Sequence, residues 1–265
     1  GLGQIDQAAR QAMISLSEAQ LVAWIAPLLW PFLRVLALFS VAPVFSMRAI
    51  PMRVKIGLAF FVALCAQAVL AEQPRIAFTG PAALGAVAQQ LTVGLAVGFA
   101  ARLVFAAVEL AGEVVGLQMG LNFASFFDPT SNAQASAVGQ FFGHIATLLF
   151  IVLNGHLLVL MAVVKSFERF PADGNFLQAL ATMQIVQLGA AVFSSALWIA
   201  LPMIALLLFV NLAMGIISRV APQMNIFAVG FPVTLSVGLL GIAATLPMLE
   251  QPLLALLQRA LELFA

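Results

Sequence analysis

Four stretches of this chain contain no Asp, Glu, Lys or Arg, and each is long enough to cross a lipid bilayer. They cover residues 76–101, 129–164, 174–218 and 220–249. A helix of about 20 residues spans the hydrocarbon core, and a single soluble core could not hide so much apolar chain. Apolar residues make up 63% of the sequence and charged residues 8%, which lies far outside the range of soluble domains. The sequence therefore predicts an all-α, multi-helix, membrane-associated protein.

Hydrophobicity along the chain predicts about six hydrophobic segments. They cover residues 19–45, 51–71, 81–120, 137–164, a span within 175–217, and 227–246. Pro27, Pro31 and Arg34 predict that the first is a kinked helix with one side against protein. The fifth is too long for one membrane helix, so an amphipathic lead-in ending near Gln187 is expected. After Pro252, apolar residues at helical spacing predict a short amphipathic helix: Leu253, Leu256, Leu257, Ala260 and Phe264.

The charges flanking these segments do not fit a simple up-and-down topology. The densest basic cluster, Arg48, Arg53 and Lys55, places the loop between the first two segments on the cytoplasmic side. Alternation then places the region after the third segment in the cytoplasm as well, where Glu109, Glu113 and Asp128 make it acidic. Either the alternation fails or a bilayer does not surround this part of the chain.

The sequence offers little enzymatic chemistry. It has no phosphate-binding loop, nucleophile elbow, HExxH or paired-cysteine motif, so we expect no enzyme activity and no cofactor or metal. His144 and His156 are twelve residues apart without a neighbouring cysteine, and are expected to be satisfied polar residues of a helix bundle. The single cysteine, Cys65, is expected to be buried.

Two further features limit the interpretation. A formal net charge of +1, without a basic stripe, argues against a nucleic-acid partner. Residues 1–12 precede Met13, and we expect them to be an expression tag or an upstream extension, so they are left out of the fold prediction. Residues 13–265 are expected to form a single domain.

Glycines recur at four-residue spacing in three places, which allows helix backbones to approach closely. Contact between helices of this chain and contact between subunits both fit the spacing. The candidate packing positions are Gly94, Gly98, Gly112, Gly116, Gly120, Gly139 and Gly143.

A polar stripe lies on the same predicted helix as five of these glycines. At about 100° per residue, Arg102, Glu109 and Glu113 fall on nearly one side, together with Gly120. Because an unpaired charge facing lipid is costly, we expect this stripe to be buried against a partner, a water-filled lumen or an internal ion pair.

The loop after the stripe carries three aromatic residues, Phe123, Phe126 and Phe127, followed by Asp128 and Pro129, which favour a turn. Irregular backbone at membrane depth must be covered by protein or line a cavity, so the loop should point inward. An aromatic constriction that excludes water and a buried turn that fills a core are both compatible with these residues.

Three passages resemble the export-gate family of FliR and its type III secretion counterparts. They are residues 39–59, 112–132 and 211–239, which lie in the family's order, and the resemblance extends from Met13 to the end. It implies a structural subunit of the flagellar protein export gate, assembled with FliP and FliQ, adjoining FlhB, and lifted largely out of the bilayer plane. It also implies a FliP-like portion followed by a FliQ-like hairpin, passage of unfolded flagellar proteins, and location in the bacterial inner membrane at the flagellar basal body.

The resemblance also assigns roles to residues. Phe123, Phe126, Phe127, Asp128 and Pro129 match a loop that helps to plug the closed channel. Residues that match assembly elements or subunit contacts are Arg48, Arg53, Lys55, Arg219, Pro222 and Asn225. Two alternatives remain: a subunit of a virulence-type secretion gate, and a small-solute secondary transporter, which would show two repeated halves with broken helices. No convincing repeat is present in the sequence.

Overall fold

The computed structural model describes residues 18–70, 81–121, 136–183, 185–221, 223 and 226–264, and these are helical with no strand among them. The predicted all-α class is confirmed. The elements are α2 (Glu18–Val41), α3 (Met52–Gln67), α4 (Pro81–Gln118), α6 (Ala137–Val152), α7 (Gly155–Arg169), α8 (Phe176–Thr182), α9 (Ile185–Val220), α10 (Ile226–Thr245), the 3₁₀ turn η1 (Leu246–Leu249) and α11 (Glu250–Glu262).

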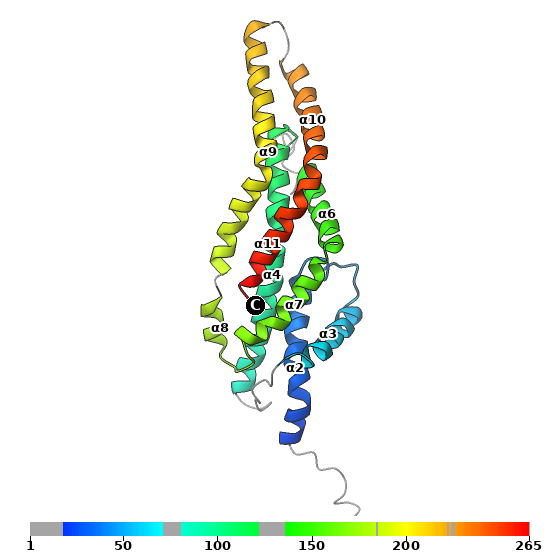
Figure 1. Cartoon of the computed structure of the whole chain (residues 1–265), viewed down its shortest axis with the longest axis vertical. Helices are drawn as coiled ribbons and strands as arrows, with labels where there is room; N and C mark the ends of the chain where they lie inside the picture. The colour runs from blue at the N-terminus through cyan, green and yellow to red at the C-terminus, as the bar shows by residue number, and fades with distance from the viewer. Residues whose placement is uncertain are drawn as a thin grey trace, which may run out of the picture.

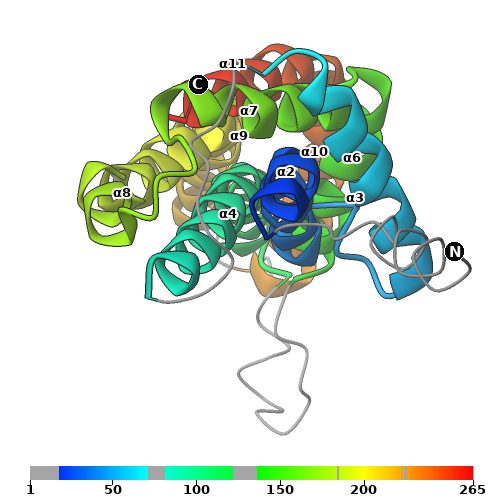
Figure 2. The same cartoon turned by 90° about the horizontal axis from the view of Figure 1, so that it is seen from below.

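The long helix α4 is the axis of the molecule. Seen end-on, it lies in the middle of a ring of helices, with α3 on one outer flank (Figure 2). The helices that pack against α4 are α2, α6, α7, α8, α9 and α11. In the side view, α9 and α10 form a hairpin that rises well beyond the other helices (Figure 1). The molecule therefore has a packed body and a projecting hairpin.

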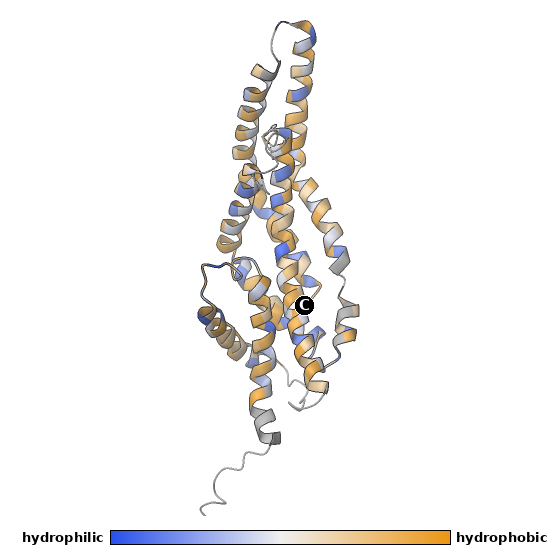
Figure 3. Ribbon diagram, turned by 180° about the vertical axis from the view of Figure 1, so that it is seen from behind, coloured by the Kyte–Doolittle hydropathy of each residue, from blue (hydrophilic) through white to orange (hydrophobic). Residues whose placement is uncertain are grey.

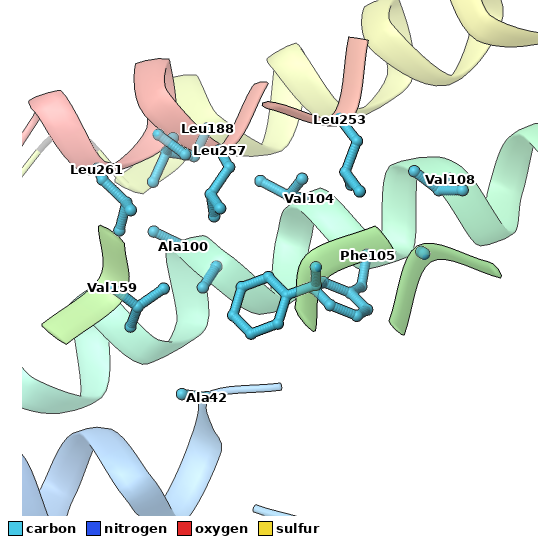
Figure 4. Packing of buried hydrophobic residues seen from close by; sticks show 14 of the residues in the cluster. Ala42, Ala100, Val104, Phe105, Val108, Val159, Leu188, Leu253, Leu257 and Leu261 are labelled. Atoms are coloured by element: carbon cyan, nitrogen blue, oxygen red, sulfur yellow. The ribbon is translucent and has the colours of Figure 1, made fainter. Parts of the chain in front are cut away.

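The core of the body is built on small residues of α4. Ala100, Ala101 and Val104 are buried, and their short side chains let the neighbouring helices approach. Leu253, Leu257 and Leu261 of α11 cover α4 from one side, while Val159 of α7 and Ala42, just after α2, approach from another (Figure 4). Phe105 of α4 meets Phe150 of α6 edge to face, with ring centroids 5.3 Å apart.

Several predicted segments correspond closely to helices, but six membrane segments is too many. Among the described residues, three stretches are long and apolar enough to cross a membrane, residues 82–118, 187–220 and 228–262. The fourth predicted segment is two helices, α6 and α7, bent by 70°, and this pair would make a fourth span. Asn154 stands at the break with a positive φ of 56°, a conformation that asparagine tolerates better than most residues.

The C-terminal half follows the prediction in more detail. A separate seven-residue helix, α8, precedes the long apolar helix as expected, but it ends at Thr182, whereas the predicted end near Gln187 lies inside α9. The amphipathic helix after Pro252 is confirmed as α11. The residues that the periodicity predicts to face inward are Leu253, Leu257, Ala260 and Phe264, which are buried, and Leu256, which is half-buried.

The predicted protein-facing side of the first segment is also confirmed, because Arg34 of α2 is fully buried. Its guanidinium donates to Gln90 Oε1 of α4 at 2.8 Å, to Ser166 Oγ of α7 at 2.9 Å and to the carbonyl oxygen of Phe170 at 2.6 Å. It also lies 3.5 Å from the ring centroid of Phe167. One side chain thus ties together three helices that are distant in sequence.

The hairpin of α9 and α10 contrasts with the body. Large apolar side chains that are exposed on it include Phe193, Trp198, Phe209, Leu212, Val220, Phe231 and Leu240. Figure 3 shows hydrophobic colouring along both helices of the hairpin. Within the chain, α9 packs against α4 near its start and against α10 farther along, so most of its outer surface is left for lipid or other protein chains.

Candidate functional site

The candidate site is the antiparallel contact between α4 and α6, from which the predicted aromatic loop leaves and to which it returns. Gly112 of α4 faces Gly139 and Phe142 of α6, where an added Cβ would lie 2.9 Å from the Gly139 Cα and the Phe142 Cβ. One turn further, a Cβ at Gly116 would lie 3.0 Å from Ser136 Oγ. The four-residue glycine spacing therefore serves close packing of two helices of the same chain.

Two glycines of α6 make room for the carboxylates of α4. A side chain at Gly139 would overlap the Glu113 carboxylate, and a Cβ at Gly143 would lie 2.8 Å from the nearest carboxylate oxygen of Glu109. The backbone N–H of Ser136 donates to Glu113 Oε1 at 2.7 Å. Ser136 in turn caps α6 by accepting from the N–H of Gly139 at 3.0 Å. Glu113 thereby fixes the start of α6 against α4.

A groove runs along this contact. It has a volume of 580 Å³ and is lined by Met47, Ala106, Glu109, Leu110, Glu113, Gly139, Gln140, Gly143, His144 and Thr147. A second hollow of 210 Å³ shares four of these residues, including Glu109, and adds Arg102 and Phe105. The predicted stripe of Arg102, Glu109 and Glu113 is therefore continuous in space.

The stripe is not enclosed by the described residues of the single chain. Arg102 and Glu109 are exposed and Glu113 is half-buried. The reason is that the glycines of α6 leave the groove open along these side chains, instead of closing over them. Enclosure of the stripe by a partner or by a lumen stays a prediction.

Gly120 has a role in ending α4 that the sequence did not predict. It lies just after α4 with a positive φ of 78°, which glycine adopts without strain. The N–H of Gly120 donates to the Leu117 carbonyl at 3.0 Å and that of Leu121 to the Gly116 carbonyl at 3.1 Å. This pair of bonds is the Schellman arrangement that ends a helix. Gly120 stops α4 at the start of the aromatic loop, and its part in helix packing or subunit contact stays a prediction.

The loop itself lies outside the described residues, together with the candidates Phe123, Phe126, Phe127, Asp128 and Pro129. Its two described boundaries, Leu121 and Ser136, belong to the ends of α4 and α6 that the glycine contact brings together. The structure therefore gives the place where the loop is anchored.

The remaining packing glycines, Gly94 and Gly98, hold α4 against α2. A Cβ at Gly94 would overlap the carbonyl oxygen of Arg34, and one at Gly98 would lie 3.0 Å from the carbonyl oxygen of Leu38. This contact places Arg34 beside Gln90.

The candidate assembly residues are on the surface where the structure describes them. Arg48 and Arg53 are exposed and Lys55 is half-buried, at the start of α3. Arg219 is exposed in the last turn of α9. Pro222 and Asn225 lie outside the described residues.

Sequence reasoning did not find two features, one polar and one of packing. Gln89 of α4 donates to Asp173 Oδ1 at 2.8 Å and accepts from the Gly174 N–H at 3.1 Å, which fastens the loop after α7. Gly238 of α10 lies against Met119, because a Cβ added at Gly238 would be 2.6 Å from the Met119 Cγ. The spacing of Gly238 and Gly241 could have indicated this close approach.

Three predictions about single polar residues have mixed outcomes. Cys65 is exposed on α3, so the expectation of burial is wrong, because α3 packs through only one side. His156 is not satisfied within the described part of the chain, since its buried Nδ1 has no hydrogen-bond partner there. His144 Nδ1 lies 2.6 Å from the Gln140 carbonyl oxygen. Within the described ranges, no group of three potential metal ligands comes together.

Comparison with known proteins was made on the whole sequence. The family described as bacterial export proteins, family 1, matches residues 25–260. The chain is 41% identical over 239 residues to the flagellar biosynthetic protein FliR of Escherichia coli (strain K12), covering 89% of this chain and 90% of that protein. It is 41% identical over 237 residues to FliR of Pectobacterium carotovorum, with the same coverage. FliR of Bacillus subtilis is 34% identical over 209 residues, covering 78% and 80%.

Proposed function

Because this chain belongs to the bacterial export proteins, family 1, we propose that it is a structural subunit of the flagellar protein export gate. The observation that carries the proposal is the similarity over nearly the whole length to three proteins that are all called flagellar biosynthetic proteins. No catalytic group is needed for this role, because a gate subunit acts through its shape and its contacts. The site of action is the bacterial inner membrane, at the flagellar basal body.

The exposed hairpin supports a role in an assembly. The apolar outer surface of α9 and α10 is too extensive for a chain that is surrounded by water. We assign it as the FliQ-like hairpin, which contacts FliP and FliQ subunits, while the body that includes α2, α4 and α6 is the FliP-like portion. FlhB adjoins this assembly, and unfolded flagellar proteins pass through the conduit that the subunits form together.

The aromatic loop is proposed to close this conduit. Glu113, Ser136 and Gly120 fix the ends of α4 and α6, so a loop between them is held at both ends by rigid elements. Phe123, Phe126 and Phe127 then exclude water from a narrow opening until an exported chain displaces them. Close packing at Gly112 and Gly139 holds α4 against α6, and so holds the two ends of the loop close together.

Assembly and closure can be tested separately. For assembly, the tagged chain is extracted in mild detergent from cells that also make FliP and FliQ, and the mass and subunits of the complex are measured. A defined complex of the three is expected, while transport of a solute by the chain alone would contradict the proposal. Secretion of flagellar hook protein by a strain lacking its own gate subunit gives the functional readout.

For closure, all three loop phenylalanines are changed to alanine in the assembled complex, and ion leak is measured in planar bilayers. The control changes Phe99 and Phe141 to alanine, since these are exposed phenylalanines on α4 and α6. Leak that rises in the loop variant and not in the control supports a plug. An equally closed channel in both variants rejects the plug and leaves the assembly proposal standing.

A further inference from the structure

Helix α3 lies on the flank of the body and is fastened by one side only. Its buried residues are Ala59, Ala63 and Ala66, at the spacing of one helix face, and its neighbour is α2. Small alanine side chains set α3 close against α2 but bury little apolar area. Figure 2 shows α3 at the periphery, on the side opposite α8.

The free side of α3 is apolar from Ile56 to Leu64. Ile56, Phe60, Phe61 and Leu64 are exposed by 43%, 42%, 65% and 40%. A Cβ added at Gly57 would meet nothing within 4 Å, so no other part of the described chain approaches there. Such a surface requires an apolar neighbour.

The start of α3 is strongly basic. Arg48 and Arg53 are exposed and Lys55 is half-buried, and the sequence contains no Asp or Glu between Glu18 and Glu72. No side chain caps this N-terminus, so its backbone N–H groups add positive potential to the cluster. The neighbour of α3 must therefore combine an apolar surface with negative charge at one end.

We propose that α3 binds anionic phospholipid, with the acyl chains against Ile56, Phe60, Phe61 and Leu64 and the headgroup at Arg48, Arg53 and Lys55. The dimensions agree. Arg53 and Cys65 are separated by about 18 Å along the helix at 1.5 Å per residue. One leaflet of hydrocarbon is about 15 Å thick, half of a typical core. A lipid whose phosphate meets Arg53 thus reaches Cys65 with the end of its acyl chain.

The basic residues Arg48, Arg53 and Lys55 explain why α3 would prefer lipids with negatively charged headgroups. Lys and Arg side chains near an anionic surface each add attraction that is screened by salt. The apolar face alone would bind neutral and anionic lipid equally. Preference for phosphatidylglycerol over phosphatidylcholine therefore isolates the contribution of the basic cluster.

Cys65 provides a site for the test, since it is the chain's single cysteine and is exposed on α3. The full chain, labelled at Cys65 with an environment-sensitive fluorophore, is reconstituted into mixed vesicles of phosphatidylglycerol and phosphatidylcholine. Either lipid is supplied with brominated acyl chains, which quench the fluorophore on contact. Brominated phosphatidylglycerol is expected to quench more strongly than brominated phosphatidylcholine, and high salt should weaken the difference.

The variant that removes the cluster is Arg48→Gln, Arg53→Gln and Lys55→Gln. It should bring the two quenchers to parity while total quenching by lipid remains. The matched control is Lys165→Gln, Arg169→Gln and Arg259→Gln, which removes three exposed charges from α7 and α11 and should keep the preference. Equal quenching by both lipids in the unaltered chain would overturn the proposal.

A second measurement separates lipid from a protein neighbour. The labelled chain is purified as a complex with FliP and FliQ and reconstituted in the same vesicles. Quenching with the same preference is expected. Loss of all lipid quenching in the complex would show that another subunit covers α3, and would reject lipid as its neighbour in the assembled state.

Discussion

The Glu113 carboxylate of α4 occupies the space that a side chain at Gly139 of α6 would fill. The relationship repeats one turn away, where Glu109 lies against Gly143. The two glutamates are four residues apart on α4, and the two glycines are four residues apart on α6. Because the helices are antiparallel, each glutamate meets one glycine along the same helix contact. The glycines of α6 therefore leave room for the carboxylates of α4, and larger residues at these two positions would displace them.

Gly139→Ala should destabilise the protein by displacing Glu113 from its hydrogen bond with the Ser136 N–H. In a Glu113→Ala background the same change should cost less, because no carboxylate must move. The coupling in this double-mutant cycle is expected to be about 1 kcal/mol. It is measured as the free energy of unfolding in mixed micelles, followed by circular dichroism. Additive effects would show that the two residues do not share this space.

Gly112→Ala should also destabilise the protein, by about 1–3 kcal/mol, because the new methyl group meets the Gly139 backbone and Phe142. Backbone cannot move aside as a flexible side chain can. Gly189→Ala in α9 is the matched control, since a Cβ there meets nothing within 4 Å. That control should gain stability from the higher helix propensity of alanine. Equal effects of both substitutions would argue against close packing at Gly112.

Arg34→Lys should destabilise the body although the charge is kept. Lysine lacks the planar fork that reaches Gln90, Ser166 and the Phe170 carbonyl together, and it loses the stacking on Phe167. Leaving even one buried acceptor unpaired costs about 1–3 kcal/mol. The unfolding midpoint in mixed micelles measures the loss. Arg102→Lys, at an exposed position, should change that midpoint little.

Asp173 should make stability depend on acid pH. Partial burial by itself would raise the pKa of the Asp173 carboxyl, but hydrogen bonds from Asn175 and Gln89 outweigh it and lower the pKa below its usual value of 3.8. A lowered pKa in the folded state gives stabilisation that is complete above about pH 4 and is lost as the pH falls through the folded pKa.

The check is a comparison of unfolding midpoints between pH 5 and pH 2.5. Asp173→Asn should be less stable than the unaltered chain at pH 5, and the difference should shrink as the pH falls. Glu168→Gln, which removes an exposed carboxylate of α7, serves as the control. A difference between Asp173→Asn and the unaltered chain that stays constant across this range would contradict the assignment.

Much of the fold could be predicted because apolar length and helical spacing are local properties. Residues 81–120 were predicted as one long segment, and α4 covers Pro81–Gln118. The face of α11 was predicted from the spacing of Leu253, Leu257 and Ala260, which are buried. The bend at Asn154 was missed because no proline marks it, and a positive φ depends on the helices on either side.

The candidate site could be predicted only in part. The sequence singled out Gly112, Gly116, Gly139 and Gly143 as packing positions, yet could not say what packs against each. It placed Gly120 with them, although this residue ends the helix. Cys65 and Glu109 are exposed because no described helix covers their sides of α3 and α4. The residue spacing within one helix cannot predict which of its sides another helix will cover.

By itself, the sequence determined that this chain is helical, apolar and built for a membrane, because backbone in such surroundings must satisfy its own hydrogen bonds. Through its resemblance it also pointed to an export gate. Only the tertiary structure decided that Arg34 joins α2, α4 and α7, and that the carboxylates of α4 rest on the glycines of α6. The physical reason is that such contacts join residues distant in the chain, whose meeting depends on how every helix packs around α4.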